Sequence, residues 1–280
     1  MLRPFLSLVV AAVGTVAGLS LTWLGVAAHA RASAALASDP LALVQTIVGV
    51  LLLAVAALSL AIHWVGVIVV GAVHALLGML ALTAPFGNPF GGGIFSPVFQ
   101  ITRMLATVDQ TLSDGAAVFY FSGTALVIGA FLVGAALGVR SRRLAGPSSV
   151  KAITVSSALG GIALLAASAI LLLAGGTFVR AMLAMFRFDG TLAALTVVGG
   201  AIAGFAGILL RWSSVGVLLA GGIALLVGVY LFASPTVLGP SGSLLGDYGL
   251  LIVAGATFLA AAGGGVVRGP AEVPDRSDAL

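Results

Sequence analysis

Long apolar stretches separated by short polar segments dominate the pattern of this chain. A helix that crosses a membrane needs about 20 mainly apolar residues, and eight stretches of the chain reach that length. They run approximately over residues 4–28, 41–62, 64–84, 115–139, 152–179, 191–210, 212–233 and 248–267. The pattern therefore predicts an all-α, polytopic bundle of eight transmembrane helices.

Two pairs of these stretches follow each other with almost no connection. Residues 41–84 carry no ionisable side chain except His63 and His74, and one helix of that length would span about two bilayers. The chain must therefore reverse near His63 and Trp64. The same reasoning places a reversal at residues 211–214, so the second and third spans, like the sixth and seventh, are predicted to be tight hairpins.

The composition explains why the solvent must be lipid. The chain is 61% hydrophobic and only 7% charged, whereas a soluble globular protein is about 25% charged. The absence of cysteine excludes disulfides and thiolate chemistry. The small basic excess, 12 basic against 8 acidic residues, is typical of arginines at membrane boundaries, so we expect the lipid bilayer and no nucleic acid as a partner.

The positions of arginine and lysine predict how the chain is threaded. With eight spans, one side carries eight of them: Arg3, Arg140, Arg142, Arg143, Lys151, Arg211, Arg268 and Arg276. The other side carries four: Arg31, Arg103, Arg180 and Arg187. The positive-inside rule then predicts a multi-pass protein of the cell membrane with both termini cytoplasmic, a basic cytoplasmic linker at 140–151 and a disordered tail at 269–280.

A shift of 150 positions brings the two halves of the chain into register. It places Gly66, Gly71, Gly78 and Pro85 on Gly216, Gly221, Gly228 and Pro235. This predicts two four-helix repeats, 1–139 and 152–268, which share one topology because each has an even number of spans. The six glycines are the expected helix-packing positions, and the third and seventh spans are expected in equivalent, central places.

The first half carries an insertion, the outer loop 85–114. After a segment rich in Pro and Gly it shows an apolar stripe with helical spacing, formed by Val98, Ile101, Leu105, Val108 and Leu112. The stripe predicts an amphipathic helix at the outer interface. That helix is either a lid packed on the bundle or an element that binds a partner or gates a substrate. Residues 178–188 are a second candidate for an interfacial stretch.

His74 is the ionisable residue that lies well inside a predicted span. Such residues are functional candidates, because charge in the bilayer is costly. It could bind a substrate, or it could make a helix-helix hydrogen bond. Its repeat partner is Ala224, and no acidic residue or second histidine lies within a span. We therefore expect no metal, no cofactor and no catalytic centre.

Two functions remain after these exclusions. A non-catalytic accessory or scaffold protein, which would act on another membrane protein, accounts for the lack of polar chemistry. The alternative is a permease-like transporter of a small or lipid-like substrate that does not couple to ions through charged residues. A membrane enzyme ranks third, because no convergent polar cluster is visible. A cavity between the halves favours transport, and a solid seam of Gly and Ala favours the accessory role.

The threading is open to a direct test with topology reporters. Fusions after Val150 and in the C-terminal tail are expected to give a cytoplasmic signal, and a fusion near Asp109 an external one, because of the arginine distribution. Alkaline phosphatase and a cytoplasm-active fluorescent protein report the two sides. Reversed signals at these three sites would contradict the assignment.

Overall fold

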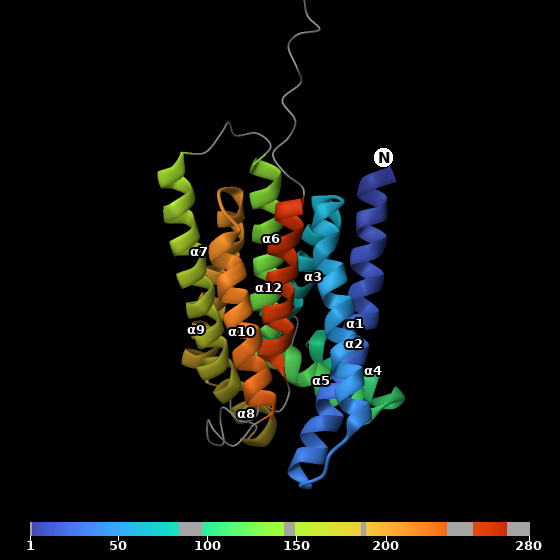
Figure 1. The fold of residues 1–280 in the computed structure, drawn as a ribbon. Coiled ribbons are helices and arrows are strands. Elements are labelled where there is room, and N and C mark those ends of the chain that lie inside the picture. Colours follow the sequence, from blue (N-terminus) through green and yellow to red (C-terminus); the bar gives the residue numbers. More distant parts are fainter. Residues whose placement is uncertain (1, 84–96, 143–148, 186–188, 234–248, 268–280) are drawn as a thin grey trace, which may run out of the picture.

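The computed structural model describes residues 2–83, 97–142, 149–185, 189–233 and 249–267, and the regular structure in these parts is helical (Figure 1). Eight helices are long and apolar enough to cross a membrane, so the predicted all-α bundle is confirmed and the chain has the character of a multi-pass integral membrane protein. The spans are α1 (Leu2–Ala34), α2 with η1 (Pro40–Leu58, Ser59–Ala61), α3 (Trp64–Thr83), α6 (Thr124–Arg142), α7 with η4 and α8 (Val150–Ile170, Leu171–Gly175, Gly176–Met185), α9 with η5 (Gly190–Ile208, Leu209–Arg211), α10 (Val215–Ala233) and α12 (Leu250–Val267).

The reversals between spans occur where the sequence predicts them. The 3-10 turns η1 and η5 end α2 and α9, and α3 and α10 begin at Trp64 and Val215. At the other end of both hairpins an aspartate caps the helix. Asp39 accepts from the Ala42 amide, and Asp189 accepts from two amides of the first turn of α9. Such caps satisfy amides that have no partner within the helix, and they place negative charge at the positive end of the helix dipole.

Charge is segregated between the two ends of the bundle. At the end that holds the N-terminus, termed here the basic end, lie Arg3, Arg140, Arg142, Lys151 and Arg211 (Figure 1). The opposite end holds the four aspartates of the described residues, Asp39, Asp109, Asp114 and Asp189. The linker 140–151 is shorter than predicted, because α6 continues through Arg142 and α7 begins at Val150.

The spans form two rings that share one edge. The first ring runs α1, α2, α12, α6, α3 and back to α1, and the second runs α7, α9, α6, α12, α10 and back to α7. The shared helices are the most enclosed, with 72% of α6 and 67% of α12 buried, against 33% for α3 and 44% for α10. The expectation of central third and seventh spans was therefore wrong. The fourth and eighth spans take that place, because each contacts helices of both rings.

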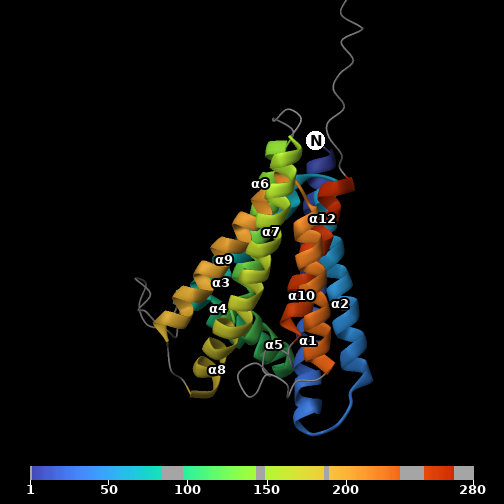
Figure 2. The same cartoon turned by 60° about the vertical axis from the view of Figure 1, so that its left-hand side comes forward.

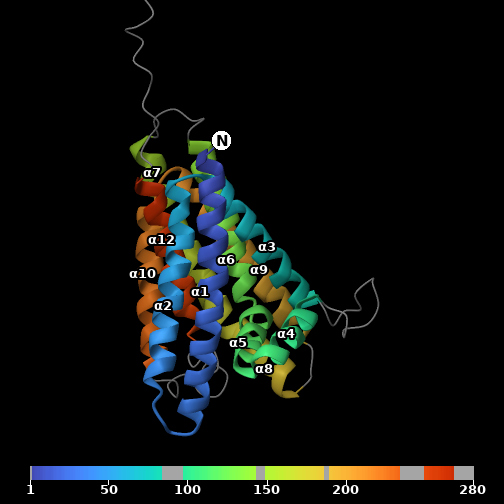
Figure 3. The same cartoon turned by 90° about the vertical axis from the view of Figure 1, so that its right-hand side faces the viewer.

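The insertion folds differently from the expectation. Two helices replace the single amphipathic one: α4 (Pro97–Val108) and α5 (Gln110–Phe121), separated at Asp109, which caps α5. A turn at Ser122 and Gly123, where Gly123 has φ of +80°, then ends α5. The fourth span consequently begins at Thr124 and not near residue 115. In Figures 2 and 3, α5 lies at the opposite end between diverging groups of spans.

Several expectations fall outside the described residues. These are the Pro- and Gly-rich part of the outer loop, residues 85–96, the matched pair Pro85 and Pro235, and the tail 269–280. Of the stretch 178–188, residues up to Met185 belong to α8, and Phe178 and Val179 are fully buried. This stretch continues the fifth span through a π-helical turn, η4.

The six glycines of the 150-residue register are all buried between helices. A β-carbon at Gly71 would lie 2.9 Å from the Gly129 carbonyl oxygen, and one at Gly228 would lie 2.6 Å from the Ile252 amide nitrogen. Real β-carbons do not approach backbone so closely, so glycine at these positions permits the contact. Helix association here depends on backbone packing.

Two glycines of α10 provide a matched test of this packing. Gly216→Ala would press a methyl group against the Ser157 backbone, whereas a β-carbon at Gly222 meets nothing within 4 Å. We expect Gly216→Ala to lower the free energy of unfolding by about 1–3 kcal/mol. We expect Gly222→Ala to leave it unchanged or raise it by up to about 1 kcal/mol, since alanine favours helix. Thermal unfolding in detergent measures both, and equal effects would contradict the packing.

Candidate functional site

His74 lies on α3, inside the first ring, and only 8% of its surface is exposed. Its Nδ1 is 2.9 Å from the Val70 carbonyl oxygen. A carbonyl can only accept, so Nδ1 donates and the neutral ring carries its proton there. Because this bond stays within α3, it does not join two helices, as one interpretation of the sequence expected. The ring instead meets Phe119 of α5 edge to face, with centroids 6.3 Å apart.

The second ring nitrogen of His74 is left without a partner. Nε2 is buried and has no hydrogen-bond partner among the described residues. In the neutral tautomer fixed by Val70, Nε2 is an acceptor. An unsatisfied buried acceptor costs about 1–3 kcal/mol, so His74 weakens the bundle unless something pairs with it.

A cavity of about 30 Å³ adjoins His74 at the centre of the first ring. Its walls come from α1, α2, α3, α5, α6 and α12 and are aliphatic except for His74, Phe119, Thr15 and Thr257. The Thr257 hydroxyl already donates to the Val253 carbonyl oxygen, at 2.8 Å. Since one water needs roughly 10–15 Å³ by this measure, the space suits about two waters and no larger solute.

The side chains around this cavity limit its chemistry. No carboxylate and no second imidazole lines it, so His74 has no partner for general acid–base work there. Within the described residues, no three His, Asp or Glu side chains come together as metal ligands would. The arrangement can hold a small hydrogen-bond donor against an apolar wall.

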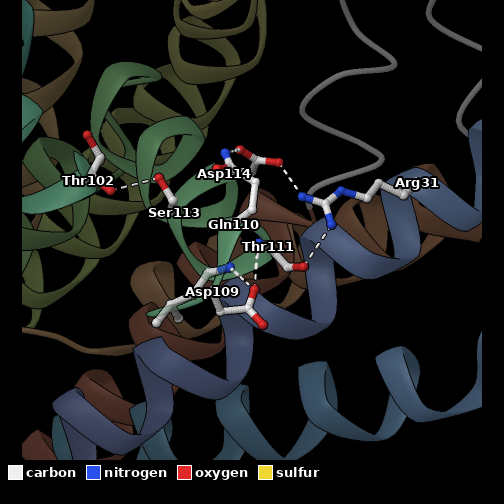
Figure 4. A network of polar contacts seen from close by, with 8 residues as sticks. Arg31, Thr102, Asp109, Gln110, Thr111, Ser113 and Asp114 are labelled. Atoms are coloured by element: carbon white, nitrogen blue, oxygen red, sulfur yellow. Dashed lines mark hydrogen bonds and ion pairs between the residues drawn. The ribbon is translucent and has the colours of Figure 1, made fainter. Parts of the chain in front are cut away.

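A polar network at the opposite end holds α5 against α1 (Figure 4). Arg31 of α1 donates to the Thr111 hydroxyl at 2.7 Å and forms an ion pair with Asp114. Gln110 donates to the other Asp114 oxygen, also at 2.7 Å. Both charges of the pair are partly exposed, with 48% and 35% of their side chains accessible, so the network orients α5 more than it stabilises the fold.

The junction of α4 and α5 is fixed by the residues around Asp109 (Figure 4). Its carboxylate accepts from the backbone amides of Leu112 and Thr111. The hydrogen bond from the Leu112 amide has the largest effect on the pKa of Asp109, followed by a hydrogen bond from the Thr111 side chain. Both hold this pKa below its ordinary value. Ser113 then donates to the Thr102 carbonyl oxygen at 2.8 Å, which ties α5 back to α4.

Helix α5 closes the cavity with aromatic side chains. Phe119 lines it, and Phe119 and Tyr120 both pack on Trp23 of α1 with centroids 5.9 and 5.8 Å away. Burial raises the pKa of Tyr120 to about 12, so it is neutral at any physiological pH. Helix α5 thus packs on the bundle beside the cavity.

The other two histidines lie near the ends of the bundle. His29 stacks on Phe232 at 3.9 Å, which connects α1 to α10, and the His63 ring accepts from the Val65 amide at the start of α3. The sequence did not predict Thr15, Thr257 and Phe119 as cavity residues. Threonine and phenylalanine carry no signal that separates a cavity wall from ordinary packing.

Comparisons of the chain with protein-family models, with curated proteins and with solved structures find no match. The site is therefore interpreted from its own residues.

The unpaired nitrogen of His74 leads to a stability prediction. His74→Phe removes the unsatisfied acceptor, and the adjoining 30 Å³ cavity can take the extra volume of the ring. We expect the free energy of unfolding to rise by about 1–3 kcal/mol, measured by thermal unfolding in detergent. A loss of stability would show that the imidazole has a partner that the variant lacks.

Proposed function

We propose that this chain is a non-catalytic accessory or scaffold protein of the cell membrane, with both termini cytoplasmic, built as two four-helix units of the same topology, 1–139 and 152–268. The close-packed seam between the units is the observation that carries the proposal.

The pattern of helix contacts supports two equivalent units. Within the first, α1 contacts α2 and α3, and α3 contacts α6; within the second, α7 contacts α9 and α10, and α10 contacts α12. Between units, α6 contacts α9 in the way that α12 contacts α2. The pair α6 and α12 lies between them. Each of these contacts between spans thus has a counterpart under exchange of the halves, as a pseudo-twofold axis along the membrane normal requires.

The same correspondence extends to individual atoms. A β-carbon at Gly66 would collide with the Ser7 backbone, and one at Gly216 with Ser157, both 150 positions later. For the last span of each unit the shift is 126: Gly78 approaches Leu126, and Gly228 approaches Ile252. Chance similarity between Gly-rich helices would not place equivalent glycines on equivalent partners.

The two hairpin turns, near residues 63 and 213, also have similar hydrogen bonds. The Ser7 hydroxyl donates to the His63 carbonyl oxygen at 2.6 Å, and the Ser157 hydroxyl donates to the Ser213 side-chain oxygen, also at 2.6 Å. The side chains at 63 and 213 then each accept from the amide two residues later, at 3.3 Å. Different side chains therefore perform the same turn-capping role.

The units meet closely along α6. There, β-carbons at Gly134 and Gly207 would collide with the Gly204 and Phe131 carbonyl oxygens. On the shared edge, Phe131 of α6 packs edge to face on Phe258 of α12, with centroids 4.6 Å apart, and both are fully buried. Packing this close between the units supports the scaffold over the permease.

One observation favours the alternative, a permease-like protein. The first ring has a cavity beside the unpaired His74, whereas the positions that correspond to Leu132 and Thr257 hold Phe258 and Phe131 in the second ring. Both counterparts are larger side chains. The two units therefore differ at the centre of their rings.

Permeation through vesicles distinguishes the two functions. We expect the full chain in phospholipid vesicles to leave glycerol and proton fluxes at the rate of protein-free vesicles, because the cavity beside His74 has a volume of only about 30 Å³. Light scattering and a trapped pH dye measure these fluxes. A protein-dependent flux that Thr15→Leu abolishes, and that Thr154→Leu at an exposed site of α7 does not, would overturn the scaffold and favour the permease.

A further inference from the structure

An apolar groove of about 420 Å³ lies on the outside of the bundle, between α3 and α9, with α6 as its floor. The two flanking helices lie next to each other beside α6 in Figure 3. Its lining is entirely apolar, and Leu137, Phe205 and Ile208 are 39–48% exposed. The volume falls in the range of small-ligand sites, about 300–1,000 Å³. In a bilayer the groove faces lipid.

The groove leads to two arginines at the basic end. Its α6 wall is Ala130, Val133, Gly134 and Leu137, and its α9 wall is Ala201, Gly204, Phe205 and Ile208. Both walls follow the spacing i, i+3, i+4, i+7 of one helix face. The next turn of each face brings in Arg140 on α6 and Arg211 at the end of η5.

Both arginines are held in place but have no counter-charge. The Arg140 guanidinium lies 4.7 Å from the centroid of Trp64, and that of Arg211 lies 4.9 Å from the centroid of Trp212. Among the described residues, the one ion pair is Arg31 with Asp114, at the far end of the bundle. Nε of Arg211 is buried without a hydrogen-bond partner in the same part of the chain. Two positioned cations beside a groove are therefore available to an anion.

The length of the groove matches one leaflet. Ten residues separate Ala130 from Arg140, and ten separate Ala201 from Arg211. At 1.5 Å per residue this is about 15 Å, half of the roughly 30 Å hydrocarbon core. A molecule with its charge at the arginines would reach the membrane midplane along the groove.

The other face of the bundle lacks these cations. Under the proposed repeat, the positions that correspond to Arg211 and Arg140 hold Ala61 and Val266. Neither of these two described positions offers a positive charge to an anion. Under the proposed repeat, the two faces of the bundle are therefore built from corresponding helices but differ in charge.

We propose that the groove between α3, α6 and α9 binds one anionic phospholipid of the leaflet at the basic end. Its phosphate lies between Arg140 and Arg211, where guanidinium groups suit phosphate geometry, and one acyl chain lies along Leu137, Gly134 and Ala130. Each chain has one such site.

Native mass spectrometry of the full chain in detergent tests this site. Delipidated protein is titrated with phosphatidylglycerol or with phosphatidylcholine of the same acyl chains. We expect one phosphatidylglycerol to bind ahead of all further lipids and more tightly than phosphatidylcholine. The double variant R140Q/R211Q should weaken that first binding about 25-fold, roughly fivefold for each arginine. R140K/R211K keeps the charge and should retain most of the affinity.

Two further variants separate the site from general surface charge. R3Q/K151Q removes two cations of the same end from helices that do not line the groove, and it should leave the first binding unchanged. Ala201→Phe fills the groove at an exposed position and should weaken both lipids. An equal loss in R3Q/K151Q, or no loss in Ala201→Phe, would overturn the proposal. The proposal would also be overturned if inorganic phosphate saturated the two arginines equally well in the Ala201→Phe protein and in the wild type, since the groove would then play no part in binding.

Discussion

The close approach of helix backbones at glycine is the constraint on which this structure depends. In lipid, burial of apolar side chains gives no advantage over contact with acyl chains, so helices associate through short-range packing. Gly66 against Ser7, Gly71 against Gly129 and Gly134 against Gly204 are contacts in which a single methyl group would not fit. These contacts join α3 to α1 and α6, and α6 to α9.

Dense packing also explains where polar groups occur. Most buried hydroxyls of the spans bond to a carbonyl of their own helix, as Thr46 and Thr196 do at equivalent positions, so they demand no partner elsewhere. His74 is different, because Nδ1 is satisfied within α3 and Nε2 is not. Its cavity is lined by Leu132 and Thr257, which are smaller than the Phe258 and Phe131 of the proposed counterpart positions.

The charged residues lie at the two ends of the bundle, and they have a different role at each end. At the opposite end Arg31 pairs with Asp114, and helix α5 is thereby held over the first ring. At the basic end Arg140 and Arg211 stack on tryptophans and face no acidic residue in the described parts of the chain. The described ion pair thus lies at the opposite end, whereas Arg140 and Arg211 at the basic end have none among the described residues. This asymmetry is the basis for the proposed lipid site.

The sequence by itself determined the all-helical class, the eight spans and the two hairpin reversals, because span length and apolar run are set by the thickness of the bilayer. It also identified the glycine register and His74. Only the tertiary structure decided that the fourth and eighth spans are central, that Asp109 divides the insertion into α4 and α5, and that α3, α6 and α9 line one groove. Those outcomes depend on which faces of uniformly apolar helices meet. With every face of a span rich in Ala, Leu, Val and Gly, helical periodicity cannot mark the contact side, and backbone fit alone selects it.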